Sequence, residues 1–383
     1  MKQEHIYLDS HATTRVDRDV LHCMMPYFTE HYGNGNHALG WKSDAAIENA
    51  RVQVGQLIGA KPSEFIFTSG ATEAINLGLL GLAKNNDSGR NHIISQKTEH
   101  AAVLQTLQQL EQEGYKITLL DVDPVGRIKL EDLKEAISEN TFMVAIMLSN
   151  NEIGTIQPIH AIGEICKKWG SLFFCDLTQG VGWYNLNLQT LPIDLAAFSS
   201  HKIYGPRGAG ALFGQKKLLK KLAPIMYGGG QEKGLRPGTV NLPAIVGFGK
   251  ACEIAFQNAK NITPKIETLR NYFQDRLFSA IPGIRLNGCP ENRHPGNLNI
   301  SIDNVSGEEL AGQLPQLIFS NSSACTNNKT SHVLAALPNK SALANEKSLR
   351  FGIGKYNTAE QIDLAAQKII NAAHILLQKK ARI

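Results

Sequence analysis

The amino-acid sequence predicts an α/β fold, with a mostly parallel sheet covered by helices on both faces and a smaller α+β domain. Short apolar strands alternate with helical segments between about residues 43 and 213, an order typical of parallel sheets. The strands are apolar throughout, as expected when both faces of a sheet are buried. The pattern changes near residue 260, and 383 residues suffice for two or three hydrophobic cores.

The predicted elements of the large domain follow one another at short intervals. A strand at 6–9 opens the chain, and Ser43 or Asp44 is expected to cap a helix whose apolar residues share one face up to Ile58. Gly70 opens the next helix, which runs through Leu82. Further strands are predicted at 65–68, 92–96, 116–122, 142–148, 171–176, 194–199 and 209–213, and further helices at 99–112, 130–138 and 160–169.

The second part of the chain begins with a long helical segment, predicted at about 262–280. We expect residues 15–260 to form the large domain, and residues 1–14 and 261–383 to form the small domain, because the N-terminal strand precedes the first helix of the large one. The small domain is predicted to contain strands at 298–302 and 317–320, a helix near 307–314 and a final helix from about 358.

Composition and charge argue against a nucleic-acid-binding, metal-binding, membrane-spanning or secreted protein. The formal net charge is only +5 and the basic residues are scattered, so we expect no direct nucleic-acid contact. The six cysteines form no CxxC pair and show no metal-ligand spacing, which is typical of reduced thiols in the cytoplasm. No apolar run is long enough to span a bilayer, and no signal segment precedes the first strand. We therefore expect a soluble cytoplasmic protein without a metal site.

Lys202 is the first candidate catalytic residue. It follows the apolar strand 194–198 together with Ser199 and His201, and open α/β sheets bind ligands at the carboxyl ends of their strands. The turn Gly205-Pro206 keeps this loop tight. A lysine in this setting is typical of one that forms an imine, for which pyridoxal 5′-phosphate (PLP) supplies the carbonyl. The alternative is an ordinary surface lysine.

Three further features fit a PLP site. Asp176 ends an apolar strand and could pair with the pyridine nitrogen, with Gln179 near the ring oxygen; a helix cap is the alternative for Asp176. The segment 68–73 joins a strand to a helix N-terminus, where backbone N–H groups favour a phosphate, although a capping box is also possible. His100 lies at a strand-to-helix junction and could stack on the ring, or could simply be a capping or core residue.

Cys325 and Arg350 are candidates in the C-terminal part. Cys325 lies in the polar stretch 320–330, which is typical of a loop with an exposed, titratable thiol, whereas most single cysteines are buried and structural. Arg350 lies in the apolar stretch 348–354 and could bind an amino-acid carboxylate through its fork of donors. A structural salt bridge explains Arg350 nearly as well.

The whole set of motifs resembles one family. The chain is similar almost from end to end to the cysteine desulfurases of the NifS/IscS type, which are fold-type I PLP enzymes of the class V aminotransferase family with a seven-stranded sheet. The motifs that carry the resemblance are Tyr7-Leu8-Asp9, Ala12-Thr13-Thr14, Thr68-Ser69-Gly70-Ala71-Thr72-Glu73, Thr98-Glu99-His100, Asn150-Asn151-Glu152-Ile153-Gly154, Asp176-x-x-Gln179, Ser199-x-His201-Lys202-Ile203-Tyr204-Gly205-Pro206, Arg236-x-Gly238-Thr239 and Ser323-Ala324-Cys325-Thr326.

The resemblance implies a role for each candidate. Lys202 would bind PLP as an imine, and Cys325 would carry the persulfide during conversion of L-cysteine to L-alanine. His100 would stack on the ring and serve in proton transfer, and Arg350 would hold the substrate carboxylate with Asn151 nearby. The resemblance also implies a homodimer with shared active sites and a sulfur-acceptor protein, either an iron–sulfur scaffold or a relay for tRNA or DNA thiolation. The cofactor contacts would come from Ala71, Thr72, His100, Asn151, Asp176, Gln179, Ser199, His201 and Lys202, with Thr239 reaching the phosphate from the second subunit.

The chain departs from the family pattern at a few positions. The run 33–37, Pro237 and His11 differ from the usual residues, and the chain ends soon after its last helix. These departures leave the sulfur acceptor open. Selenocysteine lyase or another class V aminotransferase-type enzyme would share most of these residues. A nicotinamide dehydrogenase is disfavoured because the glycines from Gly208 lack a strand-glycine-helix entry, and a non-enzymatic scaffold would need neither Lys202 nor Cys325.

Overall fold

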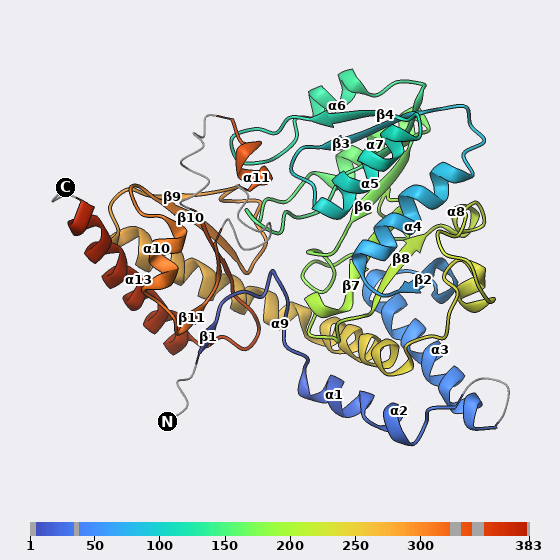
Figure 1. Cartoon of the computed structure of the whole chain (residues 1–383), viewed down its shortest axis with the longest axis horizontal. Helices are drawn as coiled ribbons and strands as arrows, with labels where there is room; N and C mark the ends of the chain where they lie inside the picture. The colour runs from blue at the N-terminus through green and yellow to red at the C-terminus, as the bar shows by residue number, and fades with distance from the viewer. Residues whose placement is uncertain (1–4, 34–37, 322–330, 339–347, 381–383) are drawn as a thin grey trace.

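Two main sheets, joined by one long helix, organise the described part of the chain (Figure 1). The structure is a computed structural model, and it describes residues 5–33, 38–321, 331–338 and 348–380. Among these residues, no helix is both long and apolar enough to cross a membrane.

The larger sheet has seven strands in the order β2-β8-β7-β6-β5-β3-β4. The pairs from β7 to β4 are parallel, whereas β8 runs antiparallel to both of its neighbours, β2 and β7. Six strands therefore share one direction and end at the same edge of the sheet, where β8 begins. The strands are β2 (Phe65–Thr68), β3 (His92–Gln96), β4 (Lys116–Leu120), β5 (Thr141–Ala145), β6 (Leu172–Asp176), β7 (Leu195–Ser199) and β8 (Gly210–Gly214).

Helices cover both faces of this sheet, as the sequence predicts. Side chains alternate along each strand, so that Phe65 and Phe67 pack with α3, α7 and α9, whereas Ile66 packs with α4 and α5. Apolar residues on both faces explain why the strands are hydrophobic throughout. The helices of this part are α1 (Arg18–Met24), α2 (Pro26–Thr29), α3 (Ala38–Ile58), α4 (Ala71–Lys84), α5 (Ala101–Gln112), α6 (Leu130–Ala136), α7 (Ile159–Trp169) and α8 (Lys216–Leu219), with short 3-10 turns η1 (Pro62–Glu64), η2 (Ser200–Lys202) and η3 (Gln231–Gly234).

The smaller part is built on a four-stranded antiparallel sheet in the order β12-β13-β10-β9. A short parallel pair of β1 and β11 lies beside it, so the N-terminal strand does pack with the C-terminal part. Helices α10 and α13 cover the core (Figure 1). The elements are β1 (Ile6–Tyr7), β9 (Ile284–Leu286), β10 (Asn297–Ile302), α10 (Gly307–Gly312), β11 (Leu317–Ile318), β12 (Ser320–Asn321), α11 (His332–Ala335), β13 (Ser348–Gly352) and α13 (Ala359–Lys380).

Helix α9 (Leu242–Ala280) connects the two parts. At 39 residues and 1.5 Å per residue it is about 58 Å long. Its first half packs Ile245 and Phe248 into the core of the large sheet, and its second half packs Phe273 and Leu277 into the core of the small part. The prediction of a helix from about 262 was therefore wrong at its start, because residues 242–261 are apolar on several sides and show no clean helical stripe.

Two other local predictions were wrong. Ser43 does not cap α3, since the helix begins at Ala38; the Ser43 hydroxyl is buried and donates to the His31 carbonyl oxygen at 3.1 Å. The strand expected at 317–320 is two short strands, β11 and β12, which belong to different sheets. In both places a tertiary contact decides the boundary, and local propensity does not.

Close packing at the start of β8 gives a test of this arrangement. A Cβ atom at Gly210 would lie 2.6 Å from the Cα of Gly70, so we expect Gly210→Ala to lower the free energy of unfolding by about 1–3 kcal/mol. Gly312→Ala is the matched control, because a Cβ there meets nothing within 4 Å. Urea unfolding followed by circular dichroism measures both, and equal stability of the two variants would contradict the close approach.

Candidate active site

A pocket of about 430 Å³ lies at the edge where the parallel strands end. Nine of the twelve residues singled out in the sequence line it, although they are spread over more than 130 positions of the chain. They converge because loops after β2, β3, β5, β6 and β7 all leave the sheet at this edge. The nine are Ala71, Thr72, His100, Asn151, Asp176, Gln179, Ser199, His201 and Lys202.

Lys202 ends a short 3-10 turn directly after β7. The turn is tight, since a Cβ at Gly205 would lie 2.0 Å from the Ser200 Oγ atom. The Lys202 ammonium donates to the backbone carbonyl of His11 and, at 2.8 Å, to that of Ala12. The N-terminal segment therefore holds the lysine head group at the pocket.

Asp176 is the last residue of β6, and only 5% of its surface is exposed. Its Oδ1 atom accepts a hydrogen bond of 2.8 Å from the backbone N–H of Thr178. The hydroxyl of Thr178 is buried and has no partner among the described residues. Gln179 follows on the same turn, so an acid, a hydroxyl and an amide come to the pocket from one short segment.

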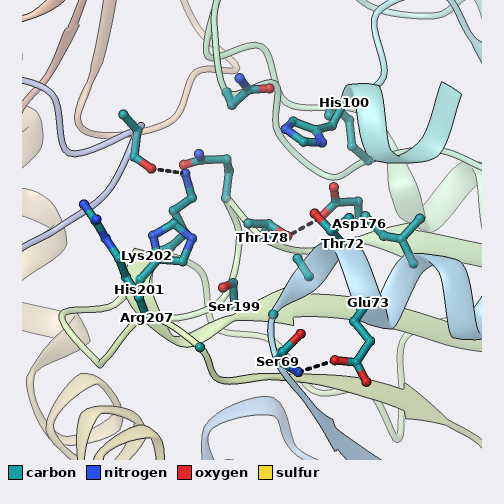
Figure 2. Close-up of a pocket in the computed structure, with 18 of the residues that line it drawn as sticks. Ser69, Thr72, Glu73, His100, Asp176, Thr178, Ser199, His201, Lys202 and Arg207 are labelled. Carbon is teal, nitrogen blue, oxygen red and sulfur yellow. Dashed lines mark hydrogen bonds between the residues drawn. The ribbon is translucent and has the colours of Figure 1, made fainter. Parts of the chain in front are cut away.

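The N-terminus of α4 forms the opposite wall. Gly70 is its N-cap and supplies no side-chain cap, so backbone N–H groups at Ala71 and Thr72 begin the helix beside the pocket, where an anion is favoured. Glu73 accepts from the Ser69 N–H at 2.7 Å (Figure 2) and also from the Arg236 side chain at 2.9 Å. Although burial opposes it, these bonds lower the pKa of Glu73.

Two histidines of the pocket are held by neighbouring groups. The His100 Nδ1 atom accepts from the Ala102 N–H at 3.1 Å and so caps α5; desolvation lowers the pKa of His100. His201 pairs with the Thr13 hydroxyl at 3.0 Å, and burial together with the cations Lys202 and Arg207 lowers its pKa to about 4. Both rings therefore favour the neutral form at neutral pH.

Two of the expected residues, Thr239 and Arg350, do not line the pocket, and the position of a third is not described. Cys325 lies outside the described residues. Thr239 is exposed on the loop after η3. Arg350 is buried and donates to the Asp9 carboxylate at 3.0 Å, the Ser320 hydroxyl at 2.8 Å and the Asn151 carbonyl at 3.3 Å. The salt bridge considered for Arg350 is thus present, and its Nε atom has no hydrogen-bond partner among the described groups.

The segments that flank 322–330 are fixed near the pocket. On one side, the Ser320 hydroxyl donates to Asp9 at 2.9 Å. On the other, the Ser331 hydroxyl donates to the Glu152 carboxylate at 2.5 Å, and the His332 Nε2 atom donates to the backbone carbonyl of Glu99 at 2.8 Å. Glu99 precedes His100, so residue 332 lies close to the pocket wall.

Several residues of the site were not singled out from the sequence. Arg207 lines the pocket beside His201 (Figure 2), and its place directly after the Gly205-Pro206 turn is the signal that could have identified it. Thr178 had no signal beyond its place between two candidates. Glu99 is buried, and burial raises the pKa of its carboxyl to about 8. It belongs to the motif Thr98-Glu99-His100, but nothing in the sequence assigns it a role of its own.

The pocket thus combines a fixed amine, a buried acid, a helix N-terminus and neutral imidazoles. The amine can react with a carbonyl, the acid can pair with a ring cation, and the helix start with Ser199 and His201 can bind a phosphate. A phosphorylated aromatic aldehyde is one ligand that could use all of these groups.

Comparisons with known proteins agree with this chemistry. The profile of the aminotransferase class-V family matches residues 6–364. The chain is 44% identical over 369 residues to the cysteine desulfurase IscS of Rickettsia typhi, covering 95% of this chain and 90% of that protein. A solved structure described as a NifS-like protein superposes with a TM-score of 0.91 at 36% identity, covering 97% of this chain and all of the other.

A second solved structure, described as SspA in complex with cysteine, superposes with a TM-score of 0.79 at 32% identity, covering 92% of this chain and 99% of that one. These similarities extend over nearly the whole length of the chain, and the fold and the pocket are consistent with them. The chain belongs to the aminotransferase class-V family and, within it, to the cysteine desulfurases of the NifS/IscS type.

Proposed function

We propose that this protein is a PLP-dependent cysteine desulfurase that converts L-cysteine to L-alanine and passes the sulfur to an acceptor protein. The observation that carries the proposal is the meeting of Lys202, Asp176, His100 and the α4 N-terminus around one pocket. The similarity to the IscS of Rickettsia typhi and to a structure that holds cysteine supports the substrate.

The residues of the pocket fit PLP. Asp176 would pair with the ring nitrogen and Gln179 would contact the ring oxygen, while the unpartnered Thr178 hydroxyl offers a further donor. Lys202 would bind the aldehyde carbon. The uncapped start of α4 fits the phosphate, which Ala71, Thr72, Ser199 and His201 would hold together with Thr239 of the partner subunit. When bound, PLP supplies an aldehyde for amines and an electron-poor ring that stabilises negative charge on an attached amino acid.

The chain's own groups supply the proton transfers. The Lys202 Nζ atom would move the α-proton of the substrate. The His100 Nδ1 atom is occupied by the Ala102 N–H, so the neutral ring carries its proton on Nε2, which is left to exchange a proton with a bound molecule. Arg350, with Asn151 beside it, would hold the substrate carboxylate through the Nε edge that is without a partner among the described groups.

Cys325 would perform the sulfur transfer. Its thiolate attacks the sulfur of the bound cysteine, so that an S–S bond forms as the C–S bond breaks. The electron pair of the broken bond stays with the substrate carbon, which takes up a proton and leaves as part of alanine. Cysteine and an enzyme thiol thus give alanine and an enzyme persulfide, and no external oxidant is required.

The remaining cysteines suit this assignment. The five described cysteines are free thiols, which supports the expected reducing cytoplasmic setting. Burial raises the pKa of Cys166 to about 12 and raises the pKa of Cys175 and Cys252 well above the ordinary value. Desolvation also raises the pKa of Cys23. None of these four thiols favours the thiolate that attack requires.

A homodimer is supported by an apolar surface around α1, α2 and the start of α3, which lie together in Figure 1. Several large apolar side chains are exposed on these helices and the loop between them, and exposed apolar surface is a feature of interaction sites. A second copy would also bring its Thr239 toward the phosphate end of the pocket, as the family resemblance implies. The exposed residues are Leu21, Met25, Phe28, Tyr32 and Trp41.

We expect borohydride to fix PLP on Lys202, because its amine is held at the pocket by two carbonyl groups. Lys202→Ala should leave no borohydride-stable label and only washable cofactor. Peptide mapping of the reduced protein makes the measurement. Label on another lysine in the unmodified chain would contradict the assignment.

We expect Cys325→Ser to bind PLP and L-cysteine normally but to form no persulfide and at least about 100-fold less alanine, since the hydroxyl is a far weaker nucleophile at neutral pH. Single-turnover assays of alanine and of alkylated persulfide measure this. Cys289→Ser is the control and should keep full activity. The reverse result for the two variants would show that Cys289 carries the sulfur.

We expect the double change Met25→Glu and Phe28→Glu to shift the protein toward a monomer that binds PLP at least about tenfold more weakly, because charges would be buried at the subunit contact. Leu364→Glu, on the exposed side of α13, should leave the dimer intact. Sedimentation velocity and PLP titration measure both properties. A monomeric unmodified chain with full activity would refute the shared site.

A further inference from the structure

His11 lies beside the site, at a position where the sequence departs from its family. It lies two residues after Asp9, on the segment that crosses from the small part to the large one, and its backbone carbonyl accepts from the Lys202 ammonium. Its side chain is 3% exposed. Burial of a histidine costs free energy unless its ring is hydrogen-bonded, so the partner of this ring is informative.

The partner is Gln179, and two hydrogen bonds join the residues. The Gln179 Nε2 atom donates to the His11 backbone carbonyl at 3.1 Å, and the Gln179 Oε1 atom lies 3.0 Å from the His11 Nδ1 atom. A backbone carbonyl can only accept, which identifies the Gln179 nitrogen. The other amide atom is therefore the carbonyl oxygen, and the His11 Nδ1 atom must be the donor to it.

The surroundings keep the ring in this position. His11 packs edge-on against His294, with ring centroids 4.6 Å apart, and His294 packs against Trp183 at 4.9 Å. The His294 Nδ1 atom accepts from the Gly296 N–H at 3.1 Å, so its ring orientation is also fixed. Neither Nε2 atom makes a hydrogen bond of regular geometry among the described residues. The backbone of Gly296 is a second, weaker polar neighbour of the His11 ring. The Gln179 bond is the one of regular geometry, so it favours the tautomer with the proton on Nδ1.

The charge state agrees with one proton on Nδ1. Burial, with the nearby Arg350 charge as the second cause, lowers the pKa of His11 to about 3. The ring is therefore neutral at neutral pH, and its single proton serves the Gln179 oxygen.

We propose that His11 is a positioning residue that fixes the Gln179 side-chain amide, so that Gln179 offers an N–H, and not its carbonyl oxygen, to a ligand in the pocket. The Gln179 Nε2 atom has two hydrogens, and the His11 carbonyl takes one. The second remains for an acceptor such as the ring oxygen of PLP. This inference rests on the proposed function for the identity of the ligand, but the His11–Gln179 pair exists without it.

The first experiment reads the tautomer in the cofactor-free protein. In long-range proton–nitrogen spectra of protein with ¹⁵N-labelled histidine, assigned with His11→Asn, the His11 ring should carry its proton on Nδ1. Gln179→Ala should shift the His11 signals. A His11 proton on Nε2, or signals that Gln179→Ala leaves unchanged, would overturn the inference whatever the cofactor does.

The second experiment is a double-mutant cycle on the PLP dissociation constant, measured by titration of cofactor-free protein. His11→Leu should raise the constant about fivefold, the effect of one hydrogen-bonding group. His11→Asn, whose amide N–H can replace Nδ1–H, should restore it to within about twofold. In the Gln179→Ala background, His11→Leu should have no further effect.

Controls separate positioning from general damage. His92→Asn changes another buried histidine, which begins β3 at the end of the strand away from the pocket. Its Nδ1 atom lies 3.0 Å from the Thr141 hydroxyl. This variant should leave PLP affinity unchanged. An equal loss from His11→Leu with and without Gln179 would overturn the positioning role. An unmodified chain that binds no PLP would refute the proposed function, and the tautomer measurement would still decide on the His11–Gln179 pair.

Discussion

The common direction of the strands is the constraint on which the site depends. Six strands of the large sheet point the same way, so the segments after β2, β3, β5, β6 and β7 leave at one edge. The antiparallel β8 starts at that edge and passes Gly70 so closely that a side chain at Gly210 would not fit. An amine, an acid and a helix N-terminus thereby meet without any of them being near another in the sequence. Helix packing on both faces maintains this edge, and the chemistry follows from it.

The N-terminal segment ties the two halves to the site. Its strand β1 pairs with β11 in the small part, while Thr14 exchanges hydrogen bonds with His201 and Tyr204 in the large part. Between these points, Asp9 binds Arg350 and the His11 and Ala12 carbonyls hold Lys202. A segment of six residues therefore contacts Arg350, Lys202 and Gln179 together. Helix α9 spans both cores and limits how far these contacts can separate.

Much of this arrangement could be predicted from the residues, and the failures have physical reasons. The apolar strands between helices were sufficient to predict the sheet, and the polar residues at strand ends were sufficient to predict most of the pocket. Both patterns can be recognised within short stretches of sequence. The start of α9 and the role of Ser43 depend on partners distant in sequence, which no local pattern reveals. The bond between Arg350 and Asp9 could not be predicted, because the two residues are far apart in the sequence. Thr178 and Arg207 are distinguished in the sequence only by the motif residues next to them. His11 was noticed only as a departure from the family, and its partner Gln179 could not be inferred without the tertiary structure.

The buried thiols carry one more consequence. An enzyme that stores sulfur as a persulfide is exposed to attack by its own cysteines, because thiol–disulfide exchange requires only a thiolate within reach. Cys166, Cys175 and Cys252 are enclosed in the core, where desolvation keeps them protonated. The fold thereby keeps these three thiols from reacting as thiolates. The same enclosure shields these three thiols from oxidants, so oxidation of the protein should not begin in its core.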